Sequence, residues 1–365
     1  MGLKKIKKLI LHIGSEKTGT TSIQSMLSLN RELLESKSIR IPMFLGKPNH
    51  RYAEYAFRSN ETQDDFDMNR GVFDDPKAKK ELKDAIKSDW KNKISTESLD
   101  TWLISCEHFQ SRLHHQQEIK NLWQFSKNLF EEISIIIYLR DPISTAYSHL
   151  STAIKGGAVL NSFNITPESV SEICNHKEIL ERWLSVVPKN CLKVRLFDKT
   201  KFTRNDLYAD FFDSCELDLR DQIQIPTTAN SSLSLRAMRL MMLLNQRIPT
   251  FFNNMRNPVR QDIHNYLEKY SIDSSFLVPS IQKAEEFKQY YRESDEYVRM
   301  NFFPHHDQEL WPYLGGRDQN ACDTESQVIF FTKEEKETAD LISIIWVNKQ
   351  RSINSLNSKL NALHP

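Results

Sequence analysis

A strand–loop–helix pattern near the N-terminus constrains this chain more than any other feature of its sequence. The apolar run Leu9–Ile13 predicts a buried strand, and Gly14 and Gly19 bracket the polar loop that follows it. Apolar residues at helical spacing then predict a helix from Thr21 onward. Such an arrangement points backbone N–H groups and the positive end of a helix dipole at one place. The sequence therefore predicts an anion site at this loop.

The side chains of the same loop suit a phosphate-like anion. Lys17 adds a full positive charge, and the hydroxyl groups of its neighbours add hydrogen-bond donors. An ordinary strand–turn–helix that binds no ligand is the plain structural alternative. If the loop holds an anion, we expect the contacts to come from one continuous segment: Ser15, Glu16, Lys17, Thr18, Gly19, Thr20, Thr21 and Ser22.

The spacing of the loop excludes two common nucleotide-binding motifs. A Walker A loop needs a lysine directly after its second glycine. Here Thr20 follows Gly19, and Lys17 lies before that glycine, so the central residue of a magnesium-dependent nucleotide hydrolase is missing. The dinucleotide fingerprint Gly-x-Gly-x-x-Gly is absent as well. The loop is therefore specialised for a different anionic ligand.

A second predicted strand ends in an arginine. The β-branched run Ile133–Leu139 predicts a central strand that is covered on both faces. Asp141 then suits a helix N-cap, and Pro142 suits the first helical position. Arg140 would lie at the carboxyl end of its strand, where open α/β sheets bind ligands. Ser148 follows eight residues later, about two helical turns into the next helix.

Together these motifs resemble those of the sulfotransferases that use 3′-phosphoadenosine 5′-phosphosulfate (PAPS). The segment Lys17–Thr21 is similar to their 5′-phosphosulfate loop, and Arg140 with Ser148 has the spacing of their 3′-phosphate site. The resemblance implies a three-layer α/β fold of the P-loop type, with a central parallel sheet flanked by helices and with helical C-terminal additions. It also implies PAPS as the donor, 3′,5′-adenosine bisphosphate (PAP) as its product, and no metal.

The predicted strand Thr101–Cys106 ends in two candidates for a general base. The resemblance implies a glutamate or a histidine in this role, and our hypothesis is that Glu107 takes the acceptor proton while His108 orients it or contacts the acceptor. The reverse assignment stays open, because histidine titrates close to neutrality. A purely structural pair is a further alternative. Lys17 would stabilise the negative charge on the departing phosphate.

Composition narrows the class of protein. The chain of 365 residues has 49 basic and 48 acidic residues, which argues against bulk nucleic-acid binding. Its five cysteines are scattered without Cys-x-x-Cys spacing, so neither a zinc site nor a disulfide framework is expected. No apolar run approaches the roughly 18 residues of a membrane-spanning helix, and the run after Met1–Lys8 is too short for a signal peptide. We expect a cytoplasmic protein without an integral membrane segment.

The order of the predicted elements suggests how the chain is divided. We expect an α/β core over residues 1–220 and a mainly helical extension, residues 221–365, packed on it. Residues 43–75 lack clear periodicity and are interpreted as an insertion over the active face. Alternating strands and helices predict a parallel sheet. The predicted strands are Leu9–Ile13, Ile39–Pro42, Thr101–Cys106, Ile133–Leu139 and Leu192–Phe197. The main predicted helices are Thr21–Ser36, Lys77–Asn92, His115–Phe130, Ile143–Ile154, Glu168–Val186, Asp206–Cys215, Leu233–Gln246, Val259–Tyr270, Ile281–Tyr291 and Lys333 to about Asn361.

The expected reaction is sulfuryl transfer from PAPS to a hydroxyl group. Residues 293–303 resemble part of bacterial sulfotransferase-like proteins linked to surface polysaccharides, so we expect a carbohydrate or glycolipid acceptor. Tyr52, Tyr55 and Phe57 of the insertion would suit stacking on sugar rings, although core packing is the commoner use of such residues. Two alternatives stay open: an ATP-dependent, kinase-like P-loop enzyme, and a catalytically inactive PAP-binding protein. The oligomeric state is also left open.

Overall fold

The fold is taken from a computed structural model, which places most of the chain. Two compact units are present, and each is described here by itself. The first comprises Met1–Thr145, Pro167–Ala229 and Glu286–Tyr313, and the second comprises Ala146–Thr166, Asn230–Glu285 and Leu314–Pro365. The division after residue 220 that was drawn from the sequence stays a prediction. The structure describes residues 6–227, 233–252, 255–257, 260, 263, 267, 277–306, 308–313, 329 and 331–363.

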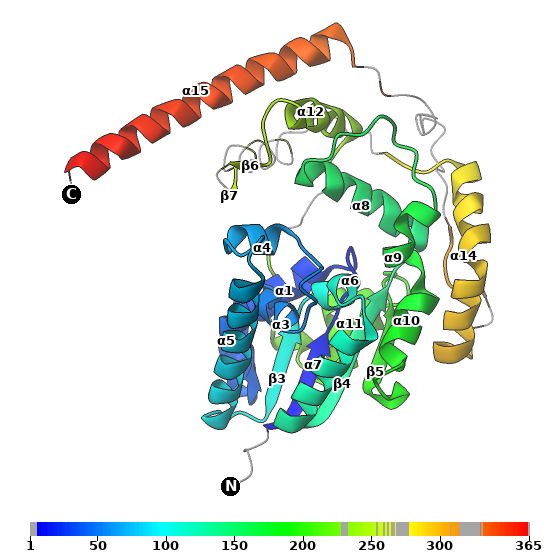
Figure 1. The fold of residues 1–365 in the computed structure, drawn as a ribbon. Coiled ribbons are helices and arrows are strands. Elements are labelled where there is room, and N and C mark those ends of the chain that lie inside the picture. Colours follow the sequence, from blue (N-terminus) through cyan, green and yellow to red (C-terminus); the bar gives the residue numbers. More distant parts are fainter. Residues whose placement is uncertain are drawn as a thin grey trace. The chain divides into compact units, whose positions relative to one another are not determined.

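The first unit is built on a five-stranded parallel sheet with the order β2-β3-β1-β4-β5 (Figure 1). Each predicted strand is present, although the ends shift by a few residues. The strands are β1 (Ile6–His12), β2 (Ile39–Arg40), β3 (Thr101–Ser105), β4 (Phe130–Leu139) and β5 (Leu192–Leu196).

The order of the strands creates a topological switch point beside β1. From β1 the chain runs to β2 and β3 on one side, and it then continues with β4 and β5 on the other side. At such a switch point, the loops after two neighbouring strands leave in opposite directions, and ligands of open α/β sheets bind there. The loop after β1 and the residue after β4, Arg140, lie at this switch point.

Helices cover both faces of the sheet, so the predicted three-layer α/β fold is confirmed. On one face, α1 (Thr20–Leu29) and α11 (Leu207–Ser214) bury their apolar side chains against Ile10 and Ile136. On the other face, Leu11 and Ile135 lie against residues of α7 (Gln116–Leu129) and α10 (His176–Leu184). These apolar contacts remove both faces of the sheet from water.

Several predicted helices are interrupted, and asparagine is the cause in two of them. The predicted helix Thr21–Ser36 divides into α1 and α2 (Arg31–Ser36), because the Asn30 side chain donates to the carbonyls of Met26 and Gln224, both at 2.8 Å. Asn175 likewise interrupts the predicted helix Glu168–Val186. Its side chain accepts from the N–H of Glu178 and so caps α10.

The segment that lacked periodicity contains short helices. Residues 43–75 form η1 (Met43–Leu45), α3 (Arg51–Tyr55) and α4 (Asp65–Asn69), and Asp64 caps α4 with a capping box. The remaining elements that include residues of the first unit are α5 (Pro76–Ser95), α6 (His108–Arg112), α8 (Pro142–Gly156), η2 (Glu168–Val170), α9 (Ser171–Cys174), η3 (Lys189–Cys191), η4 (Thr203–Asn205), η5 (Arg220–Gln222) and α14 (Ile281–Phe302).

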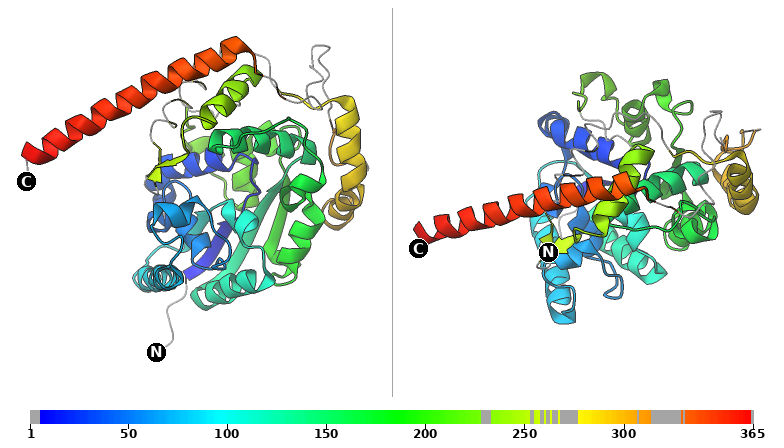
Figure 2. Two further views of the ribbon diagram at one scale, coloured as in Figure 1. Left: turned by 45° about the horizontal axis from the view of Figure 1, so that its top comes forward. Right: turned by 90° about the horizontal axis from the view of Figure 1, so that it is seen from above.

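The second unit is mainly helical in the residues that are described. Helix α12 (Leu235–Asn245) contacts α15 (Lys333–Leu363), which Figure 2 shows as one long helix. Arg239 pairs with Glu335 across these two helices at 2.7 Å. Strands β6 (Phe251–Phe252) and β7 (Met255–Arg256) form a small antiparallel pair. Most of the predicted helix Val259–Tyr270 lies outside the described residues.

Within the described ranges, none of the helices combines the length and the apolar character that a membrane span requires.

A buried carboxylate ties three elements of the first unit together. Asp210 of α11 accepts a hydrogen bond of 2.6 Å from the Tyr138 hydroxyl of β4. It also accepts from Arg195 Nε of β5 at 3.1 Å and from the N–H of Thr203 at 3.0 Å. Because Asp210 is only 1% exposed, its loss would leave several donors without an acceptor.

We expect Asp210→Ala to lower the free energy of unfolding by about 2–3 kcal/mol, because a buried charge pair loses one partner. Tyr138→Phe removes one hydrogen bond and should lower it by about 1 kcal/mol. Urea denaturation measures both. The control is Asp213→Ala, whose side chain is 55% exposed and whose effect should stay within about 0.5 kcal/mol. Equal effects of Asp210→Ala and Asp213→Ala would contradict this assignment.

Candidate active site

Two glycines shape the loop after β1 and bring it close to other elements. Gly14 has a φ of 94°, and an added Cβ atom would lie 2.8 Å from Glu107 Cα. Gly19 has a φ of 72°, and an added Cβ atom would lie 2.7 Å from Leu207 Cδ2. Both positions therefore need glycine for conformation and for space. The loop is packed between the end of β3 and the start of α11.

Backbone hydrogen bonds extend the sheet into the loop. The N–H of Tyr138 donates to the carbonyl of Gly14 at 2.8 Å, and the N–H of Ser15 donates to the carbonyl of Tyr138 at 3.1 Å. The hydroxyl of Thr18, which is fully buried, donates to the Ser15 carbonyl at 2.5 Å. The loop is thus held in one shape before any ligand arrives.

The helix after the loop starts as the sequence predicts. Gly19 is the N-cap of α1 and forms no side-chain cap, and Thr20, Thr21 and Ser22 make up the first turn. N–H groups in the first turn of a helix have no acceptor within the helix. The Ser15 hydroxyl is also buried without a hydrogen-bond partner among the described residues. The loop therefore offers several donors at one place.

Arg140 lies directly against the loop. Its Nη1 donates to the carbonyl oxygen of Lys17 at 2.9 Å, and its guanidinium lies 5.7 Å from the centre of the Phe197 ring. Burial lowers the pKa of Arg140, with Asp141 opposing the effect. Arg140 forms no ion pair with any residue that the structure describes. The structure thus brings together Lys17 and Arg140, which are 123 residues apart in sequence.

Ser148 lies on α8 and is half-buried, in the part of that helix assigned to the second unit. Its predicted role beside Arg140 in holding a 3′-phosphate stays a prediction.

Glu107 and His108 follow β3 at the same edge of the sheet. One oxygen of the Glu107 carboxylate, Oε2, accepts a hydrogen bond of 2.7 Å from Gln24 Nε2 of α1. His108 Nδ1 lies 3.5 Å from the Ser111 hydroxyl and 3.9 Å from Glu16 Oε1. Burial, and then the positive charges of Arg51 and Arg112, lower the pKa of His108 well below its usual value. His108 is therefore uncharged at neutral pH.

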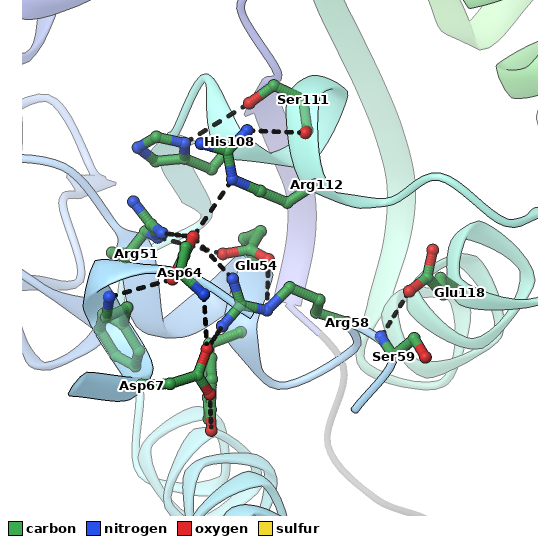
Figure 3. Close-up of polar contacts among 12 residues, drawn as sticks. Arg51, Glu54, Arg58, Ser59, Asp64, Asp67, His108, Ser111, Arg112 and Glu118 are labelled. Carbon is green, nitrogen blue, oxygen red and sulfur yellow. Dashed lines mark hydrogen bonds and ion pairs between the residues drawn. The ribbon is translucent and has the colours of Figure 1, made fainter. Parts of the chain in front are cut away.

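A cluster of arginines and carboxylates lies beside His108 (Figure 3). Asp64 contacts three guanidinium groups: Arg51, Arg58 Nη1 at 2.8 Å and Arg112 Nε at 3.1 Å. Burial disfavours the charged form of Asp64, but Arg51 and Arg58 outweigh burial and lower its pKa to about 2. Glu54 is fully buried between Arg51 and Arg58, at 3.3 and 3.5 Å.

This cluster joins segment 43–75 to the loop after β1. Arg112 contacts Asp64 of that segment with Nε and approaches Glu16 of the loop with Nη1 at 3.6 Å. Sequence reasoning assigned no role to Arg112 or Asp64. The alternating charges of residues 51–67, which include Asp64, were the available signal. The sequence does not show, however, that residues 16, 64 and 112 meet.

The structure distinguishes between the two uses that the sequence left open for the aromatic residues of this segment. Tyr55 is fully buried and Phe57 is 6% exposed, and both pack in the core rather than offering a face to a sugar. Tyr52 is half-buried, with the Arg70 guanidinium 4.8 Å from its ring centre. Tyr55 and Phe57 therefore serve core packing, because burial of their rings removes apolar surface from water.

Two buried histidines contact Ser105, the last residue of β3: His12 ends β1, and His50 directly precedes α3. His12 Nδ1 lies 2.8 Å from the Ser105 hydroxyl, and His50 Nδ1 accepts from the N–H of Ser105 at 2.9 Å. Burial lowers the pKa of His12 to about 3 and that of His50 to about 4. Both side chains are uncharged in the folded protein at neutral pH.

These pKa values predict a loss of stability in mild acid. Below pH 6.5, the ordinary pKa of histidine, the unfolded chain binds protons that the folded protein does not bind, so the free energy of unfolding falls. At pH 5.0 each of the two histidines should account for about 2 kcal/mol of this loss.

His12→Asn removes one of these titrating groups. Between pH 7.5 and 5.0, urea denaturation should show that its unfolding free energy falls by about 2 kcal/mol less than that of the wild type. His305→Gln, which changes an exposed histidine, should follow the wild type. The prediction fails if His12→Asn loses as much stability in acid as the wild type.

No protein-family model and no curated protein matches this chain. Among solved structures, the chain is similar to the crystal structure of a sulfotransferase from Alicyclobacillus acidocaldarius. The similarity covers 82% of this chain and 96% of that chain, with a TM-score of 0.44 and 14% sequence identity. Within the described residues, no three His, Cys, Asp or Glu side chains gather to hold a metal ion.

Proposed function

We propose that this protein transfers the sulfuryl group of PAPS to a hydroxyl group of an acceptor. The observation that carries the proposal is the contact between Arg140 and the Lys17 carbonyl. Because of this contact, the loop after β1 and a second cationic group lie together at the carboxyl edge of the sheet. A nucleotide with phosphates at both ends of its ribose matches these two groups.

The residues of the site fit such a nucleotide. The first turn of α1 and the unpaired Ser15 hydroxyl offer hydrogen bonds to a phosphosulfate group at the loop. Arg140 is buried enough for its pKa to fall and forms no ion pair with described residues. Its fork of N–H donors suits a terminal phosphate, and only one donor is used on Lys17. Bound PAPS would supply an activated sulfuryl group on a phosphate leaving group.

Each of the remaining groups has a proposed role. Lys17 and the N-terminal end of α1 stabilise the negative charge that grows on the departing phosphate. Glu107 takes the proton from the acceptor hydroxyl, and His108, uncharged at neutral pH, contacts the acceptor or orients Glu107. Most of the rate enhancement then comes from positioning and electrostatics, as in phosphoryl transfer.

The proposal also includes the class of acceptor and the location of the protein in the cell. We propose a carbohydrate or glycolipid acceptor and a cytoplasmic location. The groups beside His108 are charged and hydrogen-bonding (Figure 3). Such groups suit a polar acceptor, since they can replace the hydrogen bonds that it makes with water.

The two ends of the nucleotide can be tested separately. Titration calorimetry should show that Arg140→Ala weakens PAP binding by about 10- to 100-fold, because a charged hydrogen-bond donor to the 3′-phosphate is lost. The same variant should bind AMP, which lacks that phosphate, within about threefold of the wild type. Lys17→Ala should weaken both ligands, and Arg31→Ala, an exposed arginine on α2, should weaken neither.

The outcomes distinguish this proposal from its alternatives. Thermal stabilisation of the wild type by PAP and PAPS, but not by Mg-ATP, supports it by mass action on the folded state. Stabilisation by Mg-ATP alone would favour the kinase-like enzyme. Binding of PAP without any PAP formation from PAPS across a panel of glycans would favour the inactive binding protein. Equal losses for PAP and AMP in Arg140→Ala would overturn the 3′-phosphate assignment.

The base can be tested by turnover. We expect Glu107→Gln to slow PAP formation from PAPS by about two to four orders of magnitude while it binds PAP like the wild type. His108→Ala should retain more activity than Glu107→Gln. His115→Ala, a change after α6, is the matched histidine control and should leave the rate unchanged. A fully active Glu107→Gln with an inactive His108→Ala would reverse the two roles.

A further inference from the structure

One side-chain contact links the anion loop to the proposed base. Gln24 lies on α1 and is only 3% exposed. Its amide Nε2 donates to Glu107 Oε2 at 2.7 Å. The other carboxylate oxygen, Oε1, forms no hydrogen bond or ion pair with any described residue. It is also accessible to solvent. Glu107 therefore has one oxygen fixed by Gln24 and one oxygen open.

The position of Gln24 relates this carboxylate to the expected anion. Gln24 is four residues after Thr20, the first residue of α1, so it lies about 6 Å along the helix from its N-terminal end. Gly14, at the other end of the same loop, packs against the backbone and Cβ of Glu107. The loop thus contacts Glu107 on the backbone through Gly14, and its helix contacts the carboxylate through Gln24.

We propose that Gln24 is a positioning residue for sulfuryl transfer, which holds Glu107 Oε2 so that Oε1 receives the proton of the acceptor hydroxyl. The inference rests on the proposed function, in which Glu107 is the base. Because Gln24 belongs to the helix that would hold the phosphosulfate, it fixes the position of the Glu107 carboxylate relative to the leaving group. A carboxylate left to rotate would spend less time in the productive geometry.

A positioning role and a structural role of Gln24 make different predictions. If Gln24 only positions Glu107, its replacement should leave helix packing and PAP binding unchanged. Gln24→Met keeps the length of the side chain and removes only the amide, so the helix should pack as before. Binding of PAP depends on the backbone and on Lys17, and it should not change. Only the step that needs the oriented carboxylate should become slower.

The experiment measures steady-state PAP formation from PAPS with the glycan that the wild type uses fastest. We expect Gln24→Met to lower kcat by about 10- to 100-fold, with the KM for PAPS and the affinity for PAP within about twofold of the wild type. Ser25→Ala, a half-buried neighbour on the same helix, is the matched control and should keep the wild-type kcat.

A second substitution separates positioning from structure. In a Glu107→Gln background, Gln24→Met should cause no further loss of rate, because Gln24 acts through the carboxylate. An equal loss in both backgrounds, or a loss of PAP affinity, would overturn the positioning role. An active wild type with an equally active Gln24→Met would overturn this inference and leave the proposed function standing. A wild type that binds PAP but forms none from PAPS would overturn both.

Discussion

The parallel pairing of β1 with β4 is the interaction on which the site depends. Ile13, Gly14 and Ser15 continue the backbone hydrogen bonds with β4 beyond the end of β1. This continuation fixes the loop after β1 at the level of the residue after β4. Arg140 can then donate to the Lys17 carbonyl without moving either chain segment. A shift of the register by one residue would send alternate side chains to the wrong face and separate these groups.

The arginines on the two sides of the loop after β1 differ in their ion pairs. Beside His108, arginines and carboxylates occur together, and Asp64 alone contacts Arg51, Arg58 and Arg112. Such buried pairs offset the loss of hydration but add little net stability, so their effect is to hold segment 43–75 in place. On the other side, Arg140 forms no ion pair with any described residue, and Asp141 is the carboxylate whose charge acts on it. Only one N–H donor of Arg140 is used on Lys17, so the guanidinium keeps donors that a ligand could use.

The fold could be predicted from sequence because its signals are local. Apolar runs such as Leu9–Ile13 and Ile133–Leu139 indicate strands, although their ends shift by a few residues in the structure, and Gly14 and Gly19 mark the loop directly. The helix break at Asn30 could not be predicted, because it depends on Gln224, which is distant in sequence. The contact of Arg112 with Glu16 and Asp64 was missed for the same reason. The positions of polar residues at strand ends were predictable, whereas partners brought together by the tertiary structure were not; the chemical roles of these residues stay predictions.

The backbone of Lys17 links conformation to the proposed chemistry. Lys17 has a φ of 65°, a left-handed conformation that typically costs a non-glycine residue about 1–3 kcal/mol. A glycine would avoid this strain but would remove the positive charge from the loop. The left-handed turn presents the Lys17 carbonyl to Arg140, which donates a hydrogen bond to it and offsets part of the strain. Retaining lysine in a strained position is therefore explained by the charge that it brings to the loop, which an anionic ligand would use.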